Sequence, residues 1–108
     1  MTDTATTGSR VTDPPTTMQA VICHGPMDYR LEEVPVPTPG PGEVLVKVEA
    51  VGICASDLKC YHGAAKFWGD ENRPAWAETG VVPGHEFTGT VVVLDDEAAK
   101  HWGLVVGD

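Results

Sequence analysis

The stretch Glu43-Val44-Leu45-Val46-Lys47-Val48-Glu49-Ala50-Val51 decides the fold. Its side chains alternate in polarity, and one face collects the small apolar residues Val44, Val46, Val48 and Ala50. A period of two residues combined with many valines predicts a β-strand. Gly52 ends this strand, and the segment that follows it carries the first candidate site residue.

Other segments with strand character lie on both sides of this stretch. Residues 18–24 and 29–34 are predicted to pair as a hairpin through the turn at Gly25-Pro26. Residues 86–94 form a second strong strand, because the valine run at 91–93 is long enough to be buried on both faces. A further strand is expected to start at residues 104–106. Several short strands with turn signals and little helix predict a mainly β protein, either a barrel or a sandwich.

The connections between the strands are less regular. Four prolines between residues 35 and 41 favour an extended surface crossing, with an SH3-type ligand as the alternative. Residues 56–61 fit one or two helical turns, with Ser56 or Asp57 as the N-cap. Residues 62–80 show no period and are predicted to be a long loop, whereas residues 95–103 have helical character.

Composition limits the classes of protein and of partner. A length of 108 residues predicts one domain, placed at residues 18–108. The segment ahead of it, residues 1–17, has few apolar side chains and is predicted to be a disordered tail or an added linker. The net charge of −9 argues against nucleic acid and anionic membranes as partners. Three cysteines without a C-x-x-C pair and no apolar N-terminal segment predict a cytoplasmic protein.

Two short glycine-framed segments carry the candidate chemistry. Gly-Ile-Cys-Ala-Ser-Asp at 52–57 contains Cys54, and Pro-Gly-His-Glu-Phe-Thr-Gly at 83–89 contains His85 and Glu86. Cysteine, histidine and carboxylate are the usual zinc ligands, and a catalytic zinc takes three of them. If the strands before and after these segments are neighbours, the three side chains converge at one rim.

The neighbouring polar residues fit supporting roles at such a site. Asp57 is placed to accept the second ring N–H of His85, and Ser56 carries a hydroxyl close to the ligand thiolate. Alternatives remain open, because a lone cysteine after a strand is usually a small buried side chain. A closed structural site is a rival hypothesis, with the ligands Cys54, Cys60, His62 and His85. No chemical role is expected for Cys23, His24 and His101.

These motifs together resemble the N-terminal part of zinc-containing medium-chain dehydrogenases. The matching segments are Pro-Gly-Pro-Gly-Glu-Val-Leu-Val-Lys-Val (39–48), Gly-Ile-Cys-Ala-Ser-Asp-Leu (52–58), Pro-Gly-His-Glu-Phe-Thr-Gly-Thr-Val-Val (83–92) and Val-Gly-Asp (106–108). The resemblance covers residues 18–108 and implies a partial GroES-like β-barrel with short helices and long loops. It also implies NAD(P)-dependent oxidation of a small alcohol or polyol, with zinc as a Lewis acid on the substrate oxygen.

The resemblance assigns roles residue by residue. It implies that Cys54 and His85 are zinc ligands, that Glu86 is a ligand or lies close behind one, that Ser56 starts a proton relay, and that Asp57 supports His85. Lys59 stands where many members have a relay histidine, so the outer end of the relay differs here. The loop at 61–82 is longer than in most members, and residues 96–104 resemble an insertion. The loop residues Phe67, Trp68 and Trp76 are candidates to line the substrate mouth, with anchoring of the loop to the barrel as the alternative.

The resemblance also predicts what lies elsewhere. No Gly-x-Gly-x-x-Gly follows a strand, so the NAD or NADP site and the Rossmann domain of the family are expected outside this chain. We therefore expect a fragment that is inactive alone and a homo-oligomer when full length. The alternative is a non-catalytic GroES-like binding or assembly module with a vestigial metal site, which binds no metal.

Overall fold

The computed structural model describes residues 13–108 and is mainly β, as predicted from the sequence. Its strands form two separate two-stranded sheets, so the described residues contain no closed barrel. Of the predicted tail, residues 1–12 lie outside the described residues, and strand β2 begins at Thr17. The described residues divide into two compact units, one formed by 19–34 and 51–86, the other by 13–18, 35–50 and 87–108.

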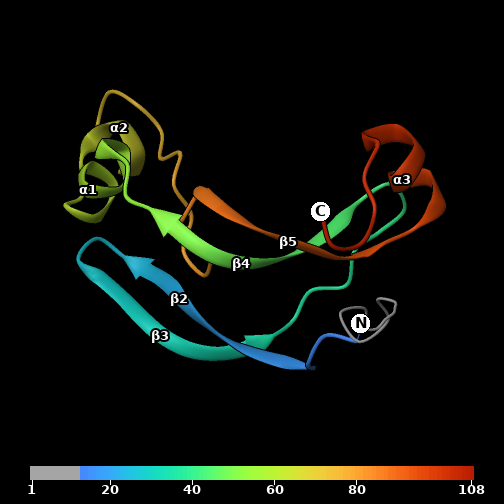
Figure 1. Cartoon of the computed structure of the whole chain (residues 1–108). Coiled ribbons are helices and arrows are strands. Elements are labelled where there is room, and N and C mark those ends of the chain that lie inside the picture. The colour runs from blue at the N-terminus through green and yellow to red at the C-terminus, as the bar shows by residue number, and fades with distance from the viewer. Residues whose placement is uncertain (1–12) are drawn as a thin grey trace. The chain divides into compact units, whose positions relative to one another are not determined.

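The first unit contains the β2–β3 hairpin and two short helices. Strand β2 (Thr17–Gly25) pairs with β3 (Asp28–Pro35), which confirms the predicted hairpin. Helix α1 (Ala55–Tyr61) and helix α2 (Ala65–Trp68) lie side by side (Figure 1). The N–H of Met27, in the hairpin turn, donates to the carbonyl of Tyr61 at 2.7 Å, which attaches the hairpin to the end of α1. The sequence predicted a loop where α2 occurs, because a four-residue helix is too short to show a period.

The 62–84 loop is fixed to the same unit at two places. The N–H of Cys23 donates to Val81 O at 2.9 Å, and the N–H of Gly80 donates to Cys23 O at 2.7 Å. The indole N–H of Trp68 donates to Cys60 O at 2.7 Å. Cys23 itself is 2% exposed and forms the core of this unit together with Ile22. The long loop therefore has defined backbone partners.

The second unit is organised on the pairing of β4 (Val44–Gly52) with β5 (Glu86–Leu94). The strands approach closely at Gly89, where an added Cβ would lie 2.2 Å from Lys47 O, so that only glycine fits. Val91 and Val92 are both buried, as expected for the valine run. The alternation of β4 does not produce a buried face: its residues from Lys47 onward are exposed.

Helix α3 (Asp96–Trp102) follows β5 in this unit and confirms the helical character of the 95–103 segment. The Asp95 side chain caps it by accepting the N–H of Ala98 at 2.7 Å. The strand expected at 104–106 is wrong. Residues 105–108 form a turn, in which the Asp108 N–H donates to Val105 O at 3.1 Å and the Asp108 carboxylate accepts the Val105 N–H at 3.0 Å. The Asp108 carbonyl then accepts the Val91 N–H at 2.8 Å, which joins the turn to β5. Among the helices of residues 13–108, none is long and apolar enough to cross a membrane.

Candidate metal centre

Cys54 lies between the end of β4 and the start of α1 in the unit that contains the hairpin. Its backbone is extended, with φ −96° and ψ 154°, and it occupies the N-cap position of α1. The helix is therefore capped at Cys54 and not at Ser56 or Asp57, which corrects the predicted cap. Asp57 instead stands at the third position of the helix, where its Oδ2 accepts the Cys54 N–H at 2.9 Å.

His85 and Glu86 lie at the start of β5, within the same unit. The structure brings Cys54, His85 and Glu86 together: one ligand atom from each residue lies within 4.8 Å of the others. No other group of three or more such ligands is found among residues 13–108. Cys54 is half-buried, whereas His85 and Glu86 are exposed, so the cluster is open to solvent in this chain.

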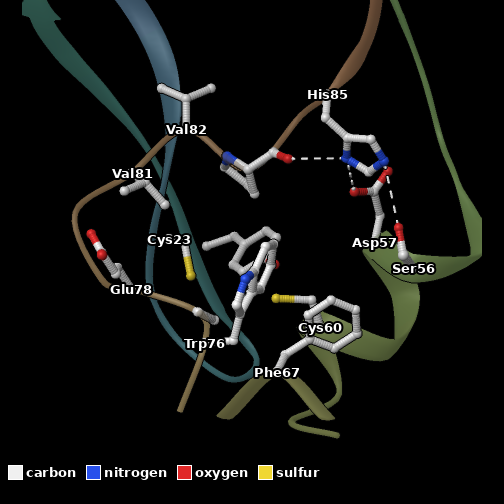
Figure 2. A pocket seen from close by; sticks show the side chains of 13 residues that line it. Cys23, Ser56, Asp57, Cys60, Phe67, Trp76, Glu78, Val81, Val82 and His85 are labelled. Carbon is white, nitrogen blue, oxygen red and sulfur yellow. Dashed lines mark hydrogen bonds and ion pairs between the residues drawn. The ribbon is translucent and has the colours of Figure 1, made fainter.

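Asp57 connects the two ligand segments. While its Oδ2 holds the Cys54 N–H, its Oδ1 lies 3.1 Å from Nδ1 of His85. The carbonyl of Pro83 lies 3.5 Å from the same nitrogen (Figure 2). With a proton on Nδ1 facing these oxygens, Nε2 is the nitrogen that carries the lone pair for a metal.

Ser56 places a hydroxyl directly at the cluster. Its Oγ–H donates to Cys54 Sγ at 3.3 Å, and its Oγ lies 3.5 Å from Nε2 of His85. Ser56 reaches this position because α1 begins immediately before it and turns the side chain back towards the N-cap. The hydroxyl can therefore exchange a proton with a molecule bound beside the ligands.

The contacts within the cluster shift two pKa values in opposite directions. The hydrogen bond from Ser56 holds the pKa of the Cys54 thiol below its ordinary value of 9.0. The hydrogen bond with Cys54 raises the pKa of His85 above 6.5, and the Pro83 carbonyl and the charge of Asp57 add to this effect.

The donor set fits zinc. Thiolate, imidazole and carboxylate are its usual ligands, and ligand atoms around one tetrahedral zinc lie about 3.3–3.8 Å apart. Nε2 of His85 lies 3.9 Å from Oε2 of Glu86, and the cluster spans 4.8 Å at most. Small side-chain rotations of exposed residues are enough to close this difference, so the chain offers three ligands and leaves a position open.

The rival structural site does not assemble in the described residues, since neither Cys60 nor His62 joins the ligand cluster. The ring of His62 packs edge-on against Tyr61 at 5.3 Å. Cys23, His24 and His101 are not in the ligand cluster. Cys23 is in the core and also lines the cavity described next, His24 pairs with Glu32, and His101 stacks on Trp102.

A cavity of about 370 Å³ adjoins the cluster and is lined by Ser56, Asp57 and His85 (Figure 2). Phe67 and Trp76 line it as the sequence indicated, whereas Trp68 does not and instead holds the loop through its indole N–H. The sequence did not indicate the other residues that line it, which are Cys23, Tyr29, Cys60, Ala77, Glu78 and the 81–83 segment. Their contribution depends on how the loop docks on β2, which no local pattern reveals.

Tyr29 is the most unusual of these wall residues. Its hydroxyl is buried and has no hydrogen-bond partner, and its ring packs edge-on against Tyr61 at 5.0 Å. Burial raises the pKa of this phenol, and the neighbouring thiols of Cys60 and Cys23 act in the same direction. The phenol is therefore neutral and adds no charge to the cavity wall.

Comparison with known proteins places the chain in a family. Residues 40–108 match the alcohol dehydrogenase GroES-like domain, and the chain belongs to this family of zinc-type medium-chain dehydrogenases. The match covers both ligand segments and most of the wall of the cavity. It confirms the family that the motifs indicated.

Several curated relatives are similar over most of the chain. Erythritol/L-threitol dehydrogenase of Mycolicibacterium smegmatis is 79% identical over 94 residues, which are 87% of this chain and 26% of that protein. Sorbitol dehydrogenase of Ovis aries is 43% identical over 73 residues, 68% of this chain and 19% of that protein. L-threonine 3-dehydrogenase of Stenotrophomonas maltophilia is 50% identical over 64 residues, which are 59% of this chain and 17% of that protein. The chain thus spans about a quarter or less of the length of these relatives.

Proposed function

We propose that this chain supplies the metal-binding part of the active site of a zinc-dependent alcohol or polyol dehydrogenase that uses NAD or NADP. The observation that carries the proposal is the convergence of Cys54, His85 and Glu86 within 4.8 Å beside a small cavity. The similarity to dehydrogenases named for erythritol, threitol and sorbitol supports a polyol as substrate. In this reaction the substrate alcohol would give up a proton and a hydride, and bound NAD or NADP would supply the acceptor for the hydride.

Cys54, His85 and Glu86 would hold the metal, with Asp57 as the positioning residue. When bound, zinc supplies Lewis acidity at the substrate oxygen and eases loss of the hydroxyl proton. Asp57 fixes the ring of His85 through Nδ1 and fixes the backbone of Cys54 through its N–H. Because one carboxylate holds both segments, it sets the spacing of the two ligands before any metal arrives.

Ser56 is the group that takes up the substrate proton. Its hydroxyl lies 3.3 Å from Cys54 Sγ and 3.5 Å from His85 Nε2, on the wall of the cavity. A substrate hydroxyl beside the ligands is thus within hydrogen-bond reach of Ser56 Oγ, which can accept the proton as it passes its own to solvent.

The free thiols fit a reducing compartment, and we propose a cytoplasmic enzyme that is a homo-oligomer when full length.

The test uses the full-length protein purified from its own source. Zinc content and NAD(P)-dependent oxidation of neutral polyols are measured for the wild-type protein and for Cys54→Ala and His85→Ala. Both variants are expected to lose zinc and activity, whereas His101→Ala, a histidine outside the cluster, is expected to keep both. Wild-type activity in either ligand variant would refute the site. A wild-type protein without metal and without turnover would favour the non-catalytic binding module.

A further inference from the structure

The cavity beside the ligand cluster has a second feature that the proposed chemistry does not use, an aromatic wall. Phe67 and Trp76 line the same cavity as Ser56 and His85, and all four belong to one compact unit (Figure 2). A volume of about 370 Å³ is at the small end of the range for small-molecule sites, roughly 300–1,000 Å³. The cavity therefore has room for a short carbon chain next to the reacting group.

Trp76 is held in place although its side chain is largely uncovered. The N–H groups of Trp76 and Ala77 both donate to the carbonyl of Phe67 at 2.7 Å. The two rings pack edge to face, with centroids 5.8 Å apart and an interplanar angle of 61°. Trp76 nevertheless remains 76% exposed. Covering this exposed indole with a ligand would be favourable, because it removes apolar surface from water. The fixed backbone already holds the indole in place for such a contact.

The turn that returns the loop to Phe67 depends on Gly69. This residue has φ +83°, and an added Cβ would lie 2.7 Å from the backbone nitrogen of Ala75. Only glycine combines this left-handed conformation with so close an approach of the chain. The turn at Gly69 therefore brings the chain back to Phe67 and places Trp76 on the cavity wall.

The charges of the cavity indicate what kind of molecule it takes. Its wall contains the carboxylates Asp57 and Glu78 and, among the described residues, neither lysine nor arginine. Apart from the metal proposed at the ligand cluster, negative charge on a substrate would face these two carboxylates and no side-chain cation in the wall. The remaining lining is mostly apolar or aromatic, which suits the C–H face of an uncharged chain.

We propose that Trp76 is a substrate-specificity residue, and that its indole packs on the carbon chain of an uncharged polyol whose reacting hydroxyl lies at Ser56 and His85. This inference rests on the proposed dehydrogenase function and names the substrate class of that site. Contact between the indole face and the C–H groups of a carbon chain favours long substrates over short ones, because a short alcohol beside the ligands leaves the indole uncovered. Carboxylates in the wall favour neutral substrates over acids.

The test compares substrates in the full-length enzyme. The probes are the neutral polyol that the wild-type protein oxidises fastest, ethanol as a short alcohol, and L-threonate as a polyol acid. Trp76→Ala is expected to raise KM for the polyol about tenfold with kcat changed less than about twofold, in line with the worth of an aromatic contact. Ethanol kinetics should not change, Trp76→Phe should recover most of the affinity, and L-threonate should react at less than about a tenth of the polyol rate.

Trp102→Ala serves as the matched control, because Trp102 is also exposed but lies in the other unit. It is expected to leave the polyol KM unchanged. An unchanged polyol KM in Trp76→Ala, or an equal change for ethanol and the polyol, would overturn the role of Trp76. Turnover of L-threonate equal to that of the polyol would overturn the preference for neutral substrates. If the wild-type protein oxidises no alcohol at all, the dehydrogenase function fails first and takes this inference with it.

Discussion

Substitution of Asp57 by asparagine should weaken zinc binding without removing any ligand. The two carboxylate oxygens serve different partners: Oδ2 accepts the Cys54 N–H at 2.9 Å, and Oδ1 faces His85 Nδ1 at 3.1 Å. Asparagine has the same size but only one acceptor oxygen. If the amide oxygen keeps the Cys54 N–H, the amide NH₂ points at the ring N–H of His85, and two donors then face each other.

The size of the effect follows from the exposure of the pair. Loss of a group that orients a metal ligand typically costs roughly 10–100-fold in metal affinity. The Asp57 side chain is 22% exposed and that of His85 is 48% exposed, so water can partly replace the lost contact. We therefore expect the lower end of that range, about tenfold, for Asp57→Asn. Asp57→Ala loses both contacts and should approach about a hundredfold.

The assay is competition for zinc between the full-length protein and a chromophoric chelator. Asp95→Asn is the matched control, since the Asp95 carboxylate likewise accepts a backbone N–H at the start of a helix, that of Ala98 at 2.7 Å, but belongs to the other unit. It should leave zinc affinity unchanged and change the melting temperature little, because asparagine is about as good an N-cap as aspartate. Equal zinc affinity in wild type and Asp57→Asn would refute the argument that one carboxylate orders both ligand segments.

Three further outcomes are expected. Zinc affinity should fall with decreasing pH as His85 becomes protonated, starting at a higher pH than for an ordinary histidine because the pKa of His85 is raised by Cys54. Folding stability of the metal-free protein should change with pH in the opposite direction. The stability contributed by protonated His85 is lost as pH rises through its pKa, which denaturation curves across pH can check. Ser56→Ala should keep zinc but lower kcat about a hundredfold, measured by steady-state kinetics, and should raise the pKa of the Cys54 thiol towards 9.0. Gly89→Ala should cost about 1–3 kcal/mol in chemical denaturation, because the new Cβ meets Lys47 O.

The strands were predictable where local signals agree with one another. The hairpin has β-rich segments on both sides of Gly25-Pro26, and β5 combines its valine run with glycine before it. Helix α2 was missed because four residues hold no period, and the strand at 104–106 was wrong because the Asp108 carboxylate closes a turn there. Apolar residues alone do not distinguish a strand from a short docked turn.

Burial was less predictable than secondary structure. The alternation of β4 indicates one apolar face, but on that face Val48 is 48% exposed and Ala50 is exposed as well. Periodicity fixes which residues share a face, whereas the cover on that face comes from other elements. The same reason explains the cavity: its walls at Tyr29 and Cys60 come together where the β2–β3 hairpin contacts α1, and neither residue carries a signal in its own segment.

The ligand cluster, in contrast, follows from the pairing of two strands. Cys54 comes just after β4 and His85 just before β5, and because these strands are neighbours their adjoining ends bring the residues close. Strand pairing alone leaves the direction of each side chain open. Asp57 removes that freedom, since its carboxylate completes the first turn of α1 on one side and holds the imidazole ring on the other. The helix cap and the ligand support are thus one interaction, and a change that breaks the cap should disturb the metal site as well.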